Sequence, residues 1–294
     1  MASFDVTDSA MKGYSFVWAE RRYLMRLALF PVLIKFICSI TVTINGYDFD
    51  FIMQSFLMLP SFFADGWVMA HLVRLIYLGQ RWPFRPTGVA ENDIAMLRDR
   101  AGGIMAGTVF FALIEFLKTG LTGLVLMGAP HGSVPGSGTG TGTGTAPTGT
   151  TPPSPPLEGM GVGDLATTAQ SSPYTAVLGL AMILVTVWAA RYLWLYIPAA
   201  AGFSGRAYLK RVGGFMGSMR LIGVWLICTV PVLFGFVVLA NIFLAPLGLG
   251  SGQMGAVGLF ALNGLRVVIV MIATLITTAG MSFVIRNMFM QDRA

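Results

Sequence analysis

Apolar residues gather in six long runs along the chain, and polar segments separate them. Each run is long enough to cross the hydrocarbon core of a bilayer, which requires about 20 residues as a helix. In the second run Pro60 predicts a kink and a shorter span, near 57–78. The pattern therefore predicts an all-α, polytopic membrane protein with six transmembrane helices. The runs are 24–45, 52–79, 102–127, 174–200, 219–246 and 256–285.

Outside these runs, every second segment contains basic residues: the N-terminal segment, the second and fourth loops and the C-terminal segment. The first, third and fifth loops contain no Lys or Arg, although the third is the longest. Lys and Arg in short loops mark the cytoplasmic side of a membrane. We therefore expect both termini and residues 80–100 and 202–218 to be cytoplasmic, with 128–172 outside. The basic residues concerned are Lys12, Arg21, Arg22, Arg81, Arg85, Arg98, Arg100, Arg206, Lys210, Arg211, Arg286 and Arg293.

Two segments outside the spans have distinctive patterns. In residues 4–23, apolar side chains recur at helical spacing and Asp5 or Thr7 could cap the first turn. This predicts an amphipathic helix on the inner membrane surface, or alternatively a polar leader continuous with the first span. Residues 128–172 alternate Gly with Thr and end in prolines, so they cannot bury apolar surface. We expect a disordered spacer between two three-span halves, 1–127 and 173–294.

The second loop opens with QRWPFRPTG, residues 80–88, in which Pro83 and Pro86 exclude a regular helix. Aromatic residues with cationic neighbours are typical of an interfacial anchor. The alternative is a docking site for another membrane protein or for an anionic lipid headgroup. Residues 89–100 predict a short surface helix. The side chains proposed for the anchor or docking site are Arg81, Trp82, Phe84 and Arg85.

Composition excludes several classes of protein. The 294 residues are 55% hydrophobic and only 11% charged, with a mean hydropathy of +0.73. Soluble domains carry about 25% charged residues, so the expected solvent is a bilayer. The net charge of +6 does not indicate nucleic-acid binding, because the basic residues form no continuous run. Abundant Arg, Gly, Ala and Thr are associated with GC-rich bacterial genomes, so we expect a multi-pass protein of the bacterial inner (plasma) membrane.

Sequence motifs for catalysis are absent. The chain has no HExxH, Cys-x-x-Cys, phosphate-binding loop or GxSxG motif. Its two cysteines lie in separate apolar runs and indicate neither a disulfide framework nor a zinc site. We expect no enzyme activity, no metal and no cofactor. The spacing of Gly103 and Gly107 is typical of close helix packing.

Four ionisable residues in four different spans fall at similar depth, namely Lys35, Asp65, Glu115 and Arg266. An isolated charge at the centre of a membrane helix costs at least about 3 kcal/mol, so these groups should face inward and pair. Lys35 and Arg266 are the expected partners of Asp65. Two more bases complete the predicted network: Lys118, one turn from Glu115, and Arg191, in the fourth span.

This intramembrane network has two interpretations. It could be structural, with ion pairs fixing which helices pack together, or it could line a polar cavity that favours an anionic ligand because its bases outnumber its acids. His71 and Arg74 are expected to lie outside it. Arg74 is about 13 Å from Asp65 along the helix axis and on its opposite side. We expect Arg74 to extend to the headgroups and His71 to be packed or interfacial.

Residues 191–231 carry a recurring bacterial arrangement: RYLWLYIPAAAGFSGRAYLKRVGGFMGSMRLIGVWLICTVP. A span with Arg ends near Pro, a short basic loop follows, and a Ser-containing turn leads into a span with Trp. This segment resembles the YciC-like proteins and the membrane domain associated with glycerophosphodiester phosphodiesterases, and residues 9–34 resemble their first helix. The similarity covers about a quarter of the chain. It implies a six-helix inner-membrane architecture but no phosphodiesterase activity, since the chain lacks that soluble domain.

Two functions fit these observations. The first is a non-enzymatic accessory, assembly or envelope-maintenance factor, favoured by the missing catalytic motifs and the basic, aromatic loops. The alternative is a small transporter or lipid-handling permease with a polar site near mid-membrane. The expected partners are the lipid bilayer, anionic lipid headgroups or another membrane protein.

Overall fold

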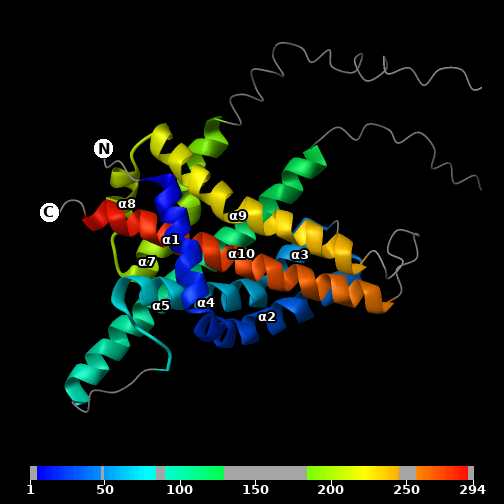
Figure 1. Ribbon diagram of the computed structural model, residues 1–294, viewed down its shortest axis with the longest axis horizontal. Coiled ribbons are helices and arrows are strands. Elements are labelled where there is room, and N and C mark those ends of the chain that lie inside the picture. Colours follow the sequence, from blue (N-terminus) through cyan, green and yellow to red (C-terminus); the bar gives the residue numbers. More distant parts are fainter. Residues whose placement is uncertain (1–4, 48–49, 84–89, 129–183, 245–255, 291–294) are drawn as a thin grey trace, which may run out of the picture.

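The computed structural model describes residues 5–47, 50–83, 90–128, 184–244 and 256–290, and within these ranges it contains helices and no strand (Figure 1). Five of the described helices are long and apolar enough to cross a membrane, and a bent helix pair raises the number to six if it counts as one span. These helices indicate a multi-pass membrane protein. Residues 129–172 of the linker predicted at 128–172 lie outside the described residues, as do Phe84 and Arg85, whereas Gly128 ends a helix.

The helices follow the apolar runs of the sequence closely. In chain order they are α1 (Val6–Ala19), α2 (Arg21–Ile44), α3 (Phe51–Leu57), α4 (Leu59–Leu78), α5 (Ala90–Gly128), the 3₁₀ helix η3 (Ala190–Trp194), α7 (Tyr196–Ala201), α8 (Gly205–Val212), α9 (Phe215–Leu244) and α10 (Ala256–Met290). Residues from Leu184 to Ala201 together form one apolar, span-length segment.

Helices α4 and α10 form the centre of the bundle. Helix α4 contacts α2, α5, α7 and α10, and α10 also contacts α1, α2 and α9. The outer helices expose large apolar side chains, such as Phe30 and Phe234, which are 64% and 70% exposed. Such a surface is unfavourable in water and suits contact with lipid. The first turn of α1, helix α8 and the last turn of α10 lie toward one end of the bundle, while α3 and the first turn of α10 lie at the other (Figure 1).

The second apolar run is broken where the sequence predicts a kink. Helices α3 and α4 meet at Met58 with a bend of 57°. Pro60 occupies the first turn of α4, where its missing backbone N–H leaves no helical hydrogen bond unmade. The bend directs α3 back against α5 and α2.

Helix α1 is a separate element and does not simply continue into the first span. The Asp5 carboxylate caps it by accepting from the backbone N–H groups of Thr7 and Asp8, at 2.9 and 3.4 Å. Its small-residue face packs on α9 and α10. The contact is close, because a Cβ added to Gly13 would lie 2.7 Å from the backbone nitrogen of Gly280. The predicted amphipathic helix therefore forms, but one face is covered by protein.

The prediction of a short surface helix at 89–100 is wrong. Residues 90–128 form one continuous helix, α5, and its first turns project from the bundle (Figure 1). Gly102 and Gly103 each weaken a helix by about 1 kcal/mol relative to Ala, which does not break it when it is packed. Gly103 and Gly107 instead permit close packing against Ala200 of α7.

Candidate functional site

Lys35 of α2 and Asp65 of α4 form an ion pair inside the bundle. The distance from Lys35 Nζ to Asp65 Oδ2 is 2.5 Å, and the side chains are 15% and 4% exposed. Of the two bases predicted for Asp65, the structure therefore selects Lys35. The second carboxylate oxygen, Oδ1, is buried and has no hydrogen-bond partner among the described residues. Helices α2 and α4 are thus joined by a pair of opposite charges in an apolar interior.

Glu115 and Lys118 form a second pair, one turn apart on α5. The distance from Lys118 Nζ to Glu115 Oε1 is 2.5 Å, as the i, i+3 spacing predicts. The structure therefore forms two ion pairs from four of the six predicted network residues, one between α2 and α4 and one within α5. These two acids and two bases have no net charge.

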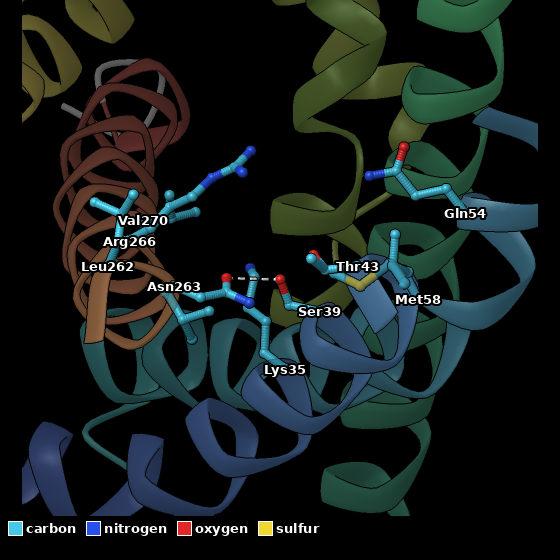
Figure 2. A pocket seen from close by; sticks show the side chains of 11 residues that line it. Lys35, Ser39, Thr43, Gln54, Met58, Leu262, Asn263, Arg266 and Val270 are labelled. Carbon is cyan, nitrogen blue, oxygen red and sulfur yellow. Dashed lines mark hydrogen bonds between the residues drawn. The ribbon is translucent and has the colours of Figure 1, made fainter. Parts of the chain in front are cut away.

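The prediction that Arg266 of α10 faces inward and pairs is wrong, because Arg266 is exposed and bonds to neither acid. Its guanidinium makes no hydrogen bond or ion pair with any residue that the structure describes. It lines a cavity of about 290 Å³ between α2, α3 and α10, together with Lys35, Ser39, Gln54 and Asn263 (Figure 2). Figure 2 shows the Arg266 side chain extending from α10 into this space, with Gln54 directed toward it from the opposite wall.

The remaining polar groups of the cavity are hydrogen-bond donors or can serve as donors. The Ser39 hydroxyl donates to Asn263 Oδ1 at 2.8 Å, which connects α2 to α10 and leaves the amide N–H groups of Asn263 as donors. Gln54 offers the same amide group. Lys35 borders the cavity while it holds Asp65. Arginine, lysine and amide donors around one space form an arrangement that binds carboxylate or phosphate oxygens.

A second cavity of about 240 Å³ adjoins the first, since Val270 lines both. Its lining is mainly apolar and aromatic and also contains Glu115, Lys118 and several threonines. The threonines and tyrosine bond to one another: Thr229 to Thr277 at 3.1 Å and Tyr196 to Thr278 at 2.8 Å. These polar groups satisfy each other across helices, so this cavity offers fewer free donors than the first.

Arg191 belongs to a different part of the structure. It stacks over Trp188 at 4.2 Å and donates to the Gly213 carbonyl at 2.9 Å, which connects η3 to the turn after α8. The hydroxyl of Tyr208 in turn donates to the Arg191 carbonyl at 3.0 Å. Burial raises the pKa of Tyr208, so this hydroxyl stays protonated and remains a donor. Arg191 therefore holds the basic connection in place and does not reach the cavity.

The prediction that Arg74 extends to the headgroups is wrong. Arg74 is 1% exposed and is among the largest fully buried side chains. It forms an ion pair with Asp99 at 2.6 Å and donates to Gln80 Oε1 at 2.9 Å and to the Ala200 carbonyl at 3.2 Å. The absence of a side chain at Gly103 makes room for it. The acid that pairs with it comes from the first turns of α5, which the sequence assigned to a surface helix.

His71 is a packed histidine. It is 1% exposed, and its ring centroid lies 4.6 Å from that of Trp67 and 5.6 Å from that of Trp82. Neither ring nitrogen has a hydrogen-bond partner in the described part of the chain. The Arg100 guanidinium lies 5.8 Å from the centroid of the Trp82 ring. His71 thus belongs to an edge-to-face aromatic cluster and not to the cavity.

The second loop begins with ordered contacts to the start of α2. Arg81 pairs with Glu20 at 2.5 Å, and the backbone N–H of Trp82 donates to the Tyr23 hydroxyl at 2.9 Å. Arg81 also lies 5.9 Å from the Tyr23 ring. Arg81 therefore faces α2, whereas Trp82 bonds to α2 through its backbone and packs its ring against Trp67 and His71 of α4. Phe84 and Arg85 are outside the described residues.

One polar contact was missed by the sequence argument. The Tyr14 hydroxyl of α1 lies 3.1 Å from the Ile227 carbonyl and 2.9 Å from the Cys228 carbonyl of α9. Pro231 cannot donate to Ile227, four residues earlier, so this carbonyl is free to accept. The sequence signal for this contact is Pro231 inside an apolar span, because the carbonyl group four residues earlier then needs a donor from another helix.

Comparisons with protein families, with curated proteins and with solved structures each found no match. Among the residues that the structure describes, no group of three metal-binding side chains occurs. The cavity offers one free guanidinium from Arg266, one ammonium group that Lys35 shares with Asp65, and neutral amide donors.

Proposed function

We propose that the protein is a non-enzymatic, six-span protein of the bacterial inner membrane that binds an anionic ligand at the Lys35–Arg266 cavity. Counting the bent pair α3–α4 as one span supports the number six. The basic segment at α8, the first turn of α1 and the last turn of α10 lie toward one end of the bundle (Figure 1), which supports cytoplasmic termini. The similarity of residues 191–231 to YciC-like proteins is part of this proposal.

The free guanidinium of Arg266 carries the proposal. A charged group beside an apolar bundle is unfavourable unless it has a partner or water. Asp65 is occupied by Lys35, and Glu115 by Lys118. A ligand that brings a negative charge would therefore complete the arrangement around Arg266.

The cavity limits the class of ligand. Its one uncompensated charge favours a carboxylate or a phosphate group, which an arginine fork can bind with two hydrogen bonds. A volume of about 290 Å³ accommodates a small anion or the anionic group of a larger molecule. This arrangement supports a small transporter or a lipid-handling permease.

An accessory, assembly or envelope-maintenance role is the second candidate. The local pairing of Lys35 with Asp65 and of Glu115 with Lys118 favours it, since these charges need no ligand to be compensated. In that case the ion pairs specify helix packing, and the cavity at Arg266 holds solvent.

Ligand binding separates the two candidates. Thermal unfolding of the purified protein in neutral detergent is measured with acetate, succinate, inorganic phosphate and glycerol 3-phosphate. We expect at least one anion to raise the midpoint for the native protein and for Arg98→Gln, an exposed arginine outside the cavity. Arg266→Gln should abolish this rise. If no anion stabilises the native protein, or if both variants respond alike, the anion site is rejected and the accessory role is favoured.

A further inference from the structure

A second arrangement of basic and apolar residues follows the outer side of α2. Arg22, Arg26, Phe30 and Ile34 are spaced four residues apart, so they lie along one side of the helix. The two arginines line a surface hollow of about 460 Å³, and Phe30 and Ile34 line a groove of about 440 Å³. One side of α2 therefore borders a basic hollow at Arg22 and Arg26 and an apolar groove at Phe30 and Ile34.

The hollow is strongly basic. Its lining contains four arginines, and its one acid, Glu20, is already paired with Arg81. Arg22 and Arg26 are exposed and make no hydrogen bond or ion pair with the described residues. The four arginines and one glutamate have a net charge of +3. The arginines are Arg21, Arg22, Arg26 and Arg81.

The groove is lined by apolar and aromatic residues. Helix α2 provides Phe30 and Ile34, and α4 provides the other wall. Phe30 is 64% exposed and Phe63 is 43% exposed, so the groove is open at the surface of the bundle. The α4 residues that line it are Pro60, Phe63, Ala64 and Trp67.

Three aromatic residues connect the hollow to the groove. Tyr23 lines the hollow, Trp67 lines the groove, and Trp82 contacts both of these residues. Its backbone N–H donates to the Tyr23 hydroxyl at 2.9 Å, and its ring centroid lies 6.3 Å from that of Trp67. Along α2, Arg26 and Phe30 are about 6 Å apart. A molecule of lipid length can therefore occupy both sites together.

We propose that this surface binds one anionic phospholipid of the cytoplasmic leaflet. Its phosphate lies between Arg22 and Arg26, and an acyl chain lies in the groove between α2 and α4. Guanidinium groups bind phosphate oxygens through paired hydrogen bonds, and tyrosine and tryptophan favour the headgroup layer. A soluble phosphorylated molecule would match the hollow but leave the apolar groove uncovered. The site does not depend on the ligand at Arg266.

The test compares two lipids that differ in headgroup charge. Protein in neutral detergent is titrated with dioleoyl phosphatidylglycerol or dioleoyl phosphatidylcholine, and bound lipid is counted by native mass spectrometry. We expect phosphatidylglycerol to bind roughly tenfold more tightly. Arg22→Gln with Arg26→Gln should remove the preference. Arg98→Gln and Arg266→Gln should keep it, which separates this site from the proposed anion cavity.

The apolar half of the site has its own test. Ala64→Trp should fill the groove and weaken phosphatidylglycerol binding, while an unchanged unfolding midpoint in lipid-free detergent shows that the variant is folded. Glycerol 3-phosphate should not displace the lipid. Equal binding of the two lipids, equal loss in Arg98→Gln, or displacement by glycerol 3-phosphate would each overturn the proposal.

Discussion

The amino group of Lys35 lies 2.5 Å from the carboxylate of Asp65, and this contact joins α2 to α4 where both helices are surrounded by apolar side chains. Breaking one member of a buried pair leaves the other charge without compensation. Substitution of only one of the two residues should therefore lower the free energy of unfolding.

Asp65→Leu should destabilise the protein by about 3 kcal/mol, because Lys35 is left unpaired. Lys35→Met combined with Asp65→Leu should recover much of this loss. Thermal unfolding in detergent is measured for Asp65→Leu, for Lys35→Met and for the double variant. The control is Arg266→Gln combined with Asp65→Leu, for which strictly additive losses are expected. Additive losses for Lys35 and Asp65 as well would contradict the pairing.

Gly102→Ala and Gly103→Ala should change stability in opposite directions. A Cβ at Gly102 meets no atom within 4 Å, so alanine should stabilise α5 by up to about 1 kcal/mol. A Cβ at Gly103 would lie 2.1 Å from Arg74 Nη1 and 2.8 Å from the Ala200 carbonyl oxygen. It should displace the buried arginine and lower the unfolding midpoint. Equal midpoints for the two variants would show that α5 and α7 are not closely packed.

Tyr14→Phe should destabilise the protein by about 1 kcal/mol, since the carbonyl groups of α9 lose a donor. The effect should shrink when Pro231→Ala restores a backbone N–H that can donate to Ile227. The coupling is measured by comparing unfolding midpoints of the two single variants and the double variant. An unchanged effect of Tyr14→Phe in the Pro231→Ala background would mean that the hydroxyl does not replace the missing helical bond.

The proposed orientation predicts opposite labelling of Asn45→Cys and Arg98→Cys. Both positions are exposed in the structure. Asn45 lies next to a loop that has no Lys or Arg, and Arg98 lies in a segment that is rich in Arg. In intact cells, and in a background lacking Cys38 and Cys228, a membrane-impermeant maleimide should label only Asn45→Cys. Permeabilised cells should label both. Labelling of Arg98→Cys in intact cells would reverse the orientation.

Hydrophobic patterning predicted the helices because membrane-spanning length is a property of sequence alone. It also placed the kink, since the geometry of Pro60 is local. The positions of the charged residues along their spans limited the expected partners of Asp65 to two bases. The choice of Lys35 also requires that α2 lies beside α4. That adjacency depends on three-dimensional packing and has no signal within one span.

The predictions for Arg74 and Arg191 were wrong because neither took account of contacts with distant segments. Arg74 was expected at the headgroups because its own helix ends nearby, yet Gly103 and Asp99 of α5 provide the space and the charge that bury it. Arg191 was placed with the other intramembrane charges by depth, but a 3₁₀ turn directs it toward Gly213. Contacts between distant segments decided both cases.

The close approach of Gly13 to Gly280 has a consequence for biosynthesis. Synthesis proceeds from α1 toward α10, yet α1 packs against both α9 and α10. The face of α1 that carries Gly13 therefore lacks its α10 partner until Gly280 has been made. A nascent chain that stops between α9 and Gly280 can dock α1 on α9 but cannot form this glycine contact.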